Sequence, residues 1–515
     1  MTVSFAPPFL ASDPRATALL DDGFRRPAAW REQIRLRQEQ RIPPEILGAL
    51  SAPHPAGERN LASLAAGASV VVTGQQVGLF LGPLYTFYKA ATAVAWARAV
   101  EEQTGARCVP LFWLQTEDHD YAEIAACQVP PSLRLSLPAV EARCSVAHLA
   151  LPEEITGLAD RLAEALAPLP HAAEVIDLVR AAYQPGRTLS QAFAEMLAAV
   201  FADEGLVFLD PRRPEIARLA SPLYVRAIEE MDAVDQALLQ RGADLRAAGL
   251  DEQVNVREGS PLVFFHGDRP DGPRRRLKRA GADFHIDGGG SISRGALLDA
   301  ARAEPLRFSS SALLRPVVQD ALLPSVAYAG GPAELGYLAQ IAPLYPLFGV
   351  RQSLAVPRAR FRLLDARSAA LLRTLGISAA EVEVPREELL KRLCGPRGAP
   401  EEMARRLLGT LPEQLAAAAA RHPPLARAAH RTQLSVERAV SRFAARHAQL
   451  VAGEDRTLSE RIDRLQSLLF PGGAPQERVH SLPFYAARHG LAALKSAVLA
   501  AVQPLAPPAV RDLTP

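Results

Sequence analysis

The amino-acid sequence predicts an α/β protein with an open parallel sheet, inserted connecting segments and a separate helical arm. Short apolar runs, each followed by a polar or glycine-rich turn and a helical segment, recur over residues 1–360. Such runs are typical of strands buried on both faces of a parallel sheet. Between residues 361 and 469 the strand patterns disappear, and Ala, Leu, Arg and Glu dominate. We therefore expect a core (1–360), an arm (361–469) and a C-terminal segment (470–515) that returns to the core.

The first predicted strand–helix–strand unit lies between residues 69 and 114. The β-branched run 69–72 leads directly into the turn TGQQ, and an alanine-rich helix is expected at 84–100, after Pro83. Proline is favoured at a helix start, where its missing N–H needs no partner. The apolar run 108–114 completes a crossover of the length that joins two parallel strands.

Further elements follow the same pattern. We expect strands at 206–209, 325–329 and 353–356, and helices at 31–41, 154–168, 173–204, from 211 to about 241, and from 333 onward. Two connecting insertions are expected, at about 135–205 and 253–310. The second alternates short apolar runs with glycine-rich loops, which predicts a small β-containing unit.

The arm shows heptad-like spacing in its last predicted helix. Intervals of four and three, with one phase break, separate Val436, Val440, Phe443, His447 and Leu450, and then Leu458, Ile462, Leu465 and Leu469. The spacing fits an amphipathic helix packed on its own chain, and it also fits an antiparallel coiled coil that projects and dimerises. A helix is expected from about 483 to 502, and residues 503–510 are expected to form a loose tail.

Charge and composition exclude several classes of protein. The net charge is only +2, so no basic field would hold nucleic acid. No run of about 18 uncharged apolar residues is present to span a membrane, and the N-terminus lacks the pattern of a secretory signal. The four cysteines, Cys108, Cys127, Cys144 and Cys394, form no CxxC pair, which argues against a disulfide framework or a cysteine zinc site. We therefore expect a cytoplasmic globular protein that binds neither nucleic acid nor membrane.

Polar residues follow each predicted strand, where ligands bind in open α/β sheets. The densest cluster is Glu117-Asp118-His119-Asp120. These side chains could supply a general base, hold an amine or bind a metal, and an aspartate here could instead cap the next helix. We predict no metal site. Asp210 follows the third strand, and Gly330, Gly331 and Glu334 follow the fourth.

The turn after the first strand reads Thr73-Gly74-Gln75-Gln76-Val77-Gly78, which matches neither a dinucleotide fingerprint nor a phosphate loop. Its glycines would permit close ligand approach, and its glutamines suit a sugar or a carboxylate, although such a segment is commonly only a loop. Lys89 could neutralise an anion or lie on the solvated surface.

Two basic segments could also meet anions. Arg315 could clamp a phosphate or carboxylate, whereas Glu334 could simply serve the helix dipole. The basic loop 274–279 is expected to be flexible and solvated, with phosphate contact as the alternative. No GxSxG or HExxH motif is present, so hydrolase and metalloprotease functions are weakly supported.

Four segments together carry a resemblance to a known family: residues 71–90 (VVTGQQVGLFLGPLYTFYKA), 109–124 (VPLFWLQTEDHDYAEI), 313–340 (LLRPVVQDALLPSVAYAGGPAELGYLAQ) and 475–490 (PQERVHSLPFYAARHG). The sequence resembles the cysteine ligase family of bacillithiol biosynthesis, BshC, from about residue 60 to 490. Val77 stands where a smaller residue is more usual, and residues 375–430 have no particular match.

The resemblance implies a Rossmann-type core with inserted connecting segments and a coiled-coil arm associated with homodimerisation. It also implies that L-cysteine is added to glucosaminyl-malate, the last step of bacillithiol biosynthesis. Amide formation requires an activated carboxyl, so we expect ATP, with magnesium present only as a nucleotide-bound ion.

On this resemblance we assign candidate roles. Asp118 and His119 are the candidate catalytic residues, as base or amine-positioning groups. The candidate substrate-binding residues are Gln75, Gln76, Tyr85, Lys89, Glu117, Asp120, Arg315, Gln319, Glu334 and Tyr337, and the candidate cofactor-binding residues are Gly74, Gly78, Gly330 and Gly331. Three alternatives stay open: a ligase for another amino-sugar acceptor, a non-catalytic metabolite-binding homologue, and a metal-dependent hydrolase that would contain stoichiometric zinc.

Overall fold

The computed structural model describes residues 2–140, 143–393, 400–454, 456–506 and 509–515. Its centre is a five-stranded parallel sheet. The strand order is β12 (Leu354–Pro357), β11 (Ser325–Gly330), β1 (Ser69–Gln75), β2 (Cys108–Leu114) and β5 (Val207–Leu209). This sheet confirms the α/β class and the expected strands.

The middle of the sheet is buried because its strands are apolar on both faces. Residues of β1 pair in register with β2 from Ser69 opposite Cys108 to Gln75 opposite Leu114. Alternate β2 side chains enter different hydrophobic clusters, with Leu111 and Trp113 in one and Phe112 in the other. Helix α6 (Tyr85–Thr104) makes the crossover from β1 to β2 and ends at Gly105, whose φ of 71° suits glycine.

Most expected helices are present, but several are shorter or divided. The N-terminal helices are α1 (Ala6–Leu10), α2 (Pro14–Thr17), α3 (Pro27–Arg37), α4 (Pro44–Ala49) and α5 (Pro55–Ala65). The helix expected at 31–41 thus begins and ends earlier, as α3. The single helix expected at 173–204 is wrong, because a turn capped by Thr188 separates α9 (Ala172–Ala182) from α10 (Leu189–Val200). The helix expected to end near 241 is likewise divided into α11 (Pro214–Glu229) and α12 (Met231–Ala247).

The connecting segments carry the remaining small elements. The segment between β2 and the first insertion holds α7 (Tyr121–Ile124), β3 (Ala126–Val129) and the start of β4 (Leu133–Ser136), and the first insertion holds α8 (Glu154–Leu166), α9 and α10. The second holds β6 (Val263–Phe265), β7 (Leu277–Ala280), β8 (Asp283–Ile286), β9 (Ser291–Ser293), α13 (Arg294–Ala303) and β10 (Phe308–Ser310). Strand β6 pairs with β10, and β7, β8 and β9 form a meander. Helices α14 (Arg315–Leu322), α15 (Pro332–Ile341) and α16 (Leu344–Leu347) flank β11 and lead to β12.

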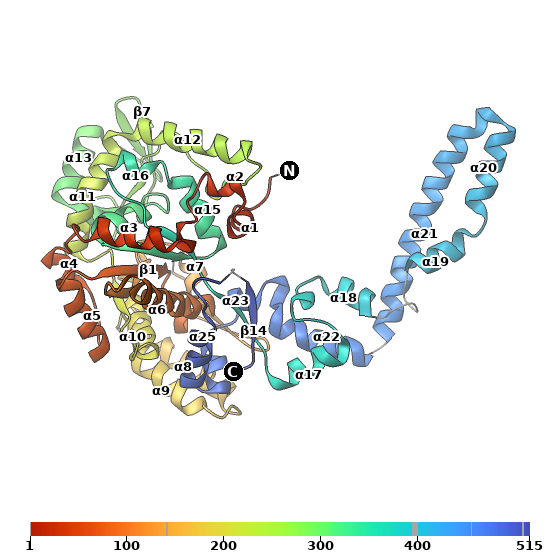
Figure 1. The fold of residues 1–515 in the computed structure, drawn as a ribbon, viewed down its shortest axis with the longest axis horizontal. Helices are drawn as coiled ribbons and strands as arrows, with labels where there is room; N and C mark the ends of the chain where they lie inside the picture. The colour runs from red at the N-terminus through yellow and green to blue at the C-terminus, as the bar shows by residue number, and fades with distance from the viewer. Residues whose placement is uncertain (1, 141–142, 394–399, 455, 507–508) are drawn as a thin grey trace.

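A helical arm projects away from the core (Figure 1). Its elements are α17 (Ala366–Leu375), α18 (Arg386–Leu393), α19 (Pro400–Leu408), α20 (Leu411–Arg421), α21 (Ala426–Glu454) and α22 (Arg456–Leu469). The heptad residues divide between two environments. Ile462, Leu465 and Leu469 of α22 are fully buried in the core of their own chain, whereas Phe443 of α21 is 57% exposed. The side chain of Leu450 lies outside the described residues, as does Cys394.

The expectation of a strand-free arm is wrong at its start, because residues 361–363 belong to a strand. Of the tail expected at 503–510, only Val510 lies in a strand among the described residues. Strand β13 (Arg360–Leu363) pairs in parallel with β14 (Val510–Leu513), which follows α23 (Gln476–Val479), α24 (Leu482–His489) and α25 (Leu491–Ala501). The helix expected at 483–502 breaks at Gly490, with φ of 82°. Each four-residue strand is too short to show an alternating pattern, and its partner lies about 150 residues away.

Candidate active site

A polar cavity of about 780 Å³ opens at the carboxyl ends of β1, β2 and β11. Strands β2 and β5 lie on one side of β1 and β11 and β12 on the other, so the cavity lies where the strand order reverses, the usual ligand site of such sheets. The predicted site residues that line it are Gln75, Gln76, Tyr85, Lys89, Glu117, Asp118, His119, Asp120, Arg315, Gly331, Glu334 and Tyr337. Gly74, Gly78, Gly330, Gln319 and Asp210 lie outside this lining.

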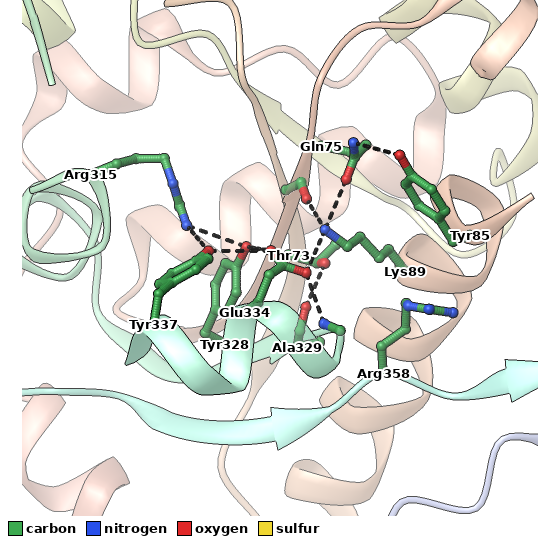
Figure 2. Close-up of polar contacts among 12 residues, drawn as sticks. Thr73, Gln75, Tyr85, Lys89, Arg315, Tyr328, Ala329, Glu334, Tyr337 and Arg358 are labelled. Carbon is green, nitrogen blue, oxygen red and sulfur yellow. Dashed lines mark hydrogen bonds and ion pairs between the residues drawn. The ribbon is translucent and has the colours of Figure 1, made fainter. Parts of the chain in front are cut away.

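Lys89 of α6 is buried in the cavity wall, so the alternative of a solvated surface lysine is wrong. Its ammonium lies 2.6 Å from Glu334 Oε2 and donates to the Gly74 carbonyl at 2.7 Å and to Gln75 Oε1 at 2.9 Å (Figure 2). Burial raises the pKa of Glu334, but Lys89 and the Tyr328 hydroxyl outweigh burial and hold it below its usual value. Burial also lowers the pKa of Lys89, and Glu334 opposes that shift. The contact joins α6 to α15.

Arg315, at the start of α14, presents a buried guanidinium to the same cavity. Nη1 donates to Gln319 Oε1 at 3.0 Å, and Nη2 donates to the Tyr337 hydroxyl at 2.7 Å (Figure 2). Among the described residues, no carboxylate oxygen lies within 4.0 Å of this guanidinium. Gln319 is fully buried and bonds Arg315, so it positions the arginine instead of meeting a ligand. Glu334 compensates the charge of the arginine only indirectly, through the Tyr328 and Tyr337 hydroxyls that bond both side chains, and, against the effect of burial, raises the pKa of Arg315. A buried guanidinium without a carboxylate in direct contact favours an anionic ligand beside Arg315.

The cluster at 117–120 divides into different roles. Glu117 is buried and accepts hydrogen bonds from the Ser310 N–H at 3.0 Å and hydroxyl at 2.5 Å, so it anchors the second insertion to β2. Asp120 caps α7 by accepting from the Glu123 N–H at 3.4 Å, the capping alternative. Asp118 and His119 are the remaining two members of the cluster, and both side chains face the cavity.

Asp118 is held as an anion. It accepts hydrogen bonds from Gln76 Nε2 at 2.7 Å and Arg274 Nη1 at 3.3 Å. Burial raises its pKa, but bonds from His119 and Gln76 and the charge of Arg274 lower the pKa well below the usual aspartate value. Glu123, which also lines the cavity, shows the opposite shift, because burial and the charges of Asp120 and Asp118 raise its pKa. Glu123 is therefore the better proton acceptor. No motif or spacing in the sequence points to this residue.

The basic loop 274–279 is expected to be flexible and solvated, and its exposed residues Arg276, Lys278 and Arg279 fit solvation, but Arg274 does not. Its guanidinium is buried 3.7 Å over the Phe264 ring and donates to His119 Nδ1 at 3.2 Å. Because a guanidinium only donates, His119 Nδ1 accepts this bond in the tautomer that carries its proton on Nε2. In the other tautomer Nδ1, which lies 3.5 Å from Asp118 Oδ1, faces that carboxylate as a donor. The following residues form β7, so this segment is a structured wall of the site.

Packing within the chain accounts for the glycines expected to bind a cofactor. A Cβ on Gly74 would lie 2.8 Å from the Trp113 carbonyl oxygen, and one on Gly330 would lie 3.0 Å from Glu334 Cβ. The Gly78 carbonyl accepts from the Tyr183 hydroxyl at 3.1 Å. At the N-terminus of α15, the Gly331 N–H donates to Glu334 Oε2 at 2.8 Å, so a carboxylate of the chain already occupies that helix end.

The sequence also missed the part of the wall that the C-terminal segment supplies. Arg358, after β12, donates Nη1 to Glu477 Oε2 at 2.8 Å and Nη2 to Oε1 at 3.0 Å, and both side chains are buried. This bidentate pair holds α23 against the core and leaves Arg478 lining the cavity. Residues 475–490 belonged to the family resemblance, but nothing local identified their partner.

Two further observations concern the part of the chain that the structure describes. There, no group of three or more His, Cys, Asp or Glu is arranged to hold a metal ion. No described helix combines the length and apolar character needed to cross a membrane.

Comparison with known proteins identifies the family. The family model described as "Bacillithiol biosynthesis BshC, N-terminal Rossmann-like domain" matches residues 2–359. A relative from Solibacter usitatus (strain Ellin6076), named "Putative cysteine ligase BshC", is 35% identical over 440 residues, 82% of this chain and 81% of the relative. A relative of the same name from Koribacter versatilis (strain Ellin345) is 34% identical over 459 residues, 87% of this chain and 84% of the relative. The chain therefore belongs to the BshC family of bacillithiol biosynthesis, and its core is the Rossmann-like domain of that family.

Proposed function

We propose that the protein is a cytoplasmic ligase that joins the carboxyl group of L-cysteine to the amine of glucosaminyl-malate, the last step of bacillithiol biosynthesis. The name of its relatives and the family match support a ligase. The single observation that carries the proposal is Arg315, a buried cation without a carboxylate partner among the described residues, facing a cavity large enough for a small substrate. We assign the malate carboxylates to Arg315.

The chain's own groups suit the handling of an amine. Asp118, with its lowered pKa, can hold and orient the acceptor ammonium group. Glu123, with its raised pKa, can take the proton that the amine must lose before it attacks. His119, in the tautomer protonated on Nε2, can donate a hydrogen bond to the carbonyl oxygen as negative charge develops there. In this scheme Glu123 takes the place of Asp118 as the candidate base.

A carboxylate is a poor electrophile, so the proposal includes ATP, which would supply carboxyl activation when bound. The cavity lining suits an anionic co-substrate, because it contains eight Arg and Lys side chains against five Asp and Glu. Magnesium would enter with the nucleotide.

The test is mass spectrometry of the purified protein with cysteine and glucosaminyl-malate, with and without ATP. We expect bacillithiol only with ATP, and the nucleotide product, ADP or AMP, identifies the activated intermediate as an acyl phosphate or an acyl adenylate. No product in either mixture would contradict the proposal. Product from another amino sugar alone would favour the ligase with a different acceptor, and ligand binding without any turnover would favour the non-catalytic homologue.

The homodimer through the arm is part of the same proposal. Phe443, at a heptad position of α21, is 57% exposed, although a side chain of this size is normally buried. A second copy of the arm would cover it.

A further inference from the structure

Three arginines that line the cavity have no carboxylate partner in the described part of the chain. Arg143 belongs to the first connecting insertion, and Arg257 and Arg276 belong to the second. All three line the cavity, and we call them the rim arginines. Among the described residues, none of their guanidinium groups has a carboxylate oxygen within 4.0 Å. Two other cations of the wall do have such a partner, because Lys89 pairs with Glu334 and Arg358 with Glu477.

The second insertion gathers like charges instead of separating them. Arg274 and Arg276 lie 3.7 Å and 5.3 Å from the centre of the same Phe264 ring. Arg274 is occupied by Asp118, His119 and Ser310, whereas Arg276 contacts the ring and has no carboxylate oxygen within 4.0 Å among the described residues. Burial and the neighbouring charge of Arg257 lower the pKa of Arg276, and the charge of Asp287 opposes them. The three rim arginines are exposed, so their guanidinium groups are accessible to an anion that enters the cavity.

The usual phosphate position of this fold is closed in this chain. Phosphate groups commonly bind at a helix N-terminus after a glycine turn. Here the Glu334 carboxylate accepts from the Gly331 N–H and pairs with Lys89, so an anion at that place would meet a like charge. The rim arginines instead offer three cations without a carboxylate within 4.0 Å among the described residues.

We propose that Arg143, Arg257 and Arg276 bind the phosphate groups of the nucleotide that activates the cysteine carboxyl. This inference rests on the proposed function. Guanidinium groups form paired hydrogen bonds with phosphate oxygens, and three cations match a triphosphate better than a dicarboxylate. Phosphates at the rim lie beside His119 and Asp118, and the acceptor carboxylates lie across β1 at Arg315. The two anionic substrates thereby occupy separate ends of one cavity.

The test is isothermal titration calorimetry of the full chain without cysteine, using ATP, inorganic tripolyphosphate and L-malate. The variant is R257A/R276A, and the control is R161A/R218A, which removes the same charge from exposed arginines outside the cavity lining. We expect the rim variant to lose about tenfold or more in affinity for ATP and tripolyphosphate. The control variant is expected to bind both as the unchanged chain does, and malate binding is expected to be equal in all three proteins.

Several results would overturn this inference. These are unchanged ATP affinity in the rim variant, an equal loss in the control, loss of malate binding alone, or no binding of ATP or tripolyphosphate to the unchanged chain. Failure of the ligase proposal is distinguishable, because it gives no bacillithiol while the arginine-dependent binding of tripolyphosphate remains.

Discussion

The Lys89 ammonium lies 2.6 Å from the Glu334 carboxylate, and both groups are buried. This ion pair joins the helix after β1 to the helix after β11, across the point where the strand order reverses. The polar wall of the cavity is therefore also a structural connection between the two halves of the sheet.

Removing one charge of the Lys89–Glu334 pair is expected to lower the free energy of unfolding more than removing both charges. K89M leaves the Glu334 charge buried and should lower the free energy of unfolding by about 3–5 kcal/mol, whereas K89M/E334Q should recover much of this loss. Urea denaturation at neutral pH measures both. Equal losses in the two variants would show that the charges are not energetically paired.

The Lys89–Glu334 pair also predicts that the stability of the fold depends on pH. Because the pKa of Glu334 is lower in the folded chain than that of an ordinary glutamate, its contribution to stability is present above the ordinary pKa and is lost as pH falls through the folded pKa. Urea midpoints followed from pH 7 to pH 3 should therefore fall less in K89M/E334Q than in the unchanged chain.

Arg315 is expected to set the affinity for the acidic acceptor. R315M should raise the KM for glucosaminyl-malate about tenfold to a hundredfold, because a charged hydrogen-bonding partner is lost, while the KM for cysteine changes little. Initial rates with each substrate varied in turn measure the effect. An equal rise for both substrates would indicate general damage to the cavity, and Y337F, which keeps the guanidinium, is the milder control.

Asp118 and Glu123 are expected to differ in their effect on pH–rate profiles. E123Q should remove the acidic limb of kcat/KM and lower the rate about a hundredfold or more, because it removes the proton acceptor. D118N should lower the rate but keep that limb, since Asp118 is already ionised throughout the accessible range. A lost limb in D118N with an intact limb in E123Q would reverse the assignment.

The arm offers a matched pair of substitutions for testing the homodimer. Phe443 and Leu434 are both exposed on α21, but nine residues at 100° each place them on opposite sides of the helix. F443E should convert a dimer to a monomer in light scattering, whereas L434E should leave it dimeric. A dimer that persists in F443E would place the interface elsewhere.

The local sequence pattern was sufficient to predict much of the fold. The strands at 69–72, 108–114, 206–209 and 325–329 were visible because central parallel strands are apolar at nearly every position. Helix ends were less reliable, since the break between α9 and α10 depends on a side-chain cap at Thr188. Strands β13 and β14 were not predicted, because each forms by pairing with the other and the two lie far apart in the sequence.

Motif identity and hydrophobic runs were enough to predict the family, the α/β class and the sheet edge where polar residues collect. Which of those residues contact one another depended on the folded chain. It turned Glu117 toward Ser310, buried Lys89 against Glu334, and brought Arg274 to His119 across 155 positions of chain. The physical reason is that a charged side chain leaves water only where a distant partner or a ligand compensates it, and such partners are not encoded in local spacing.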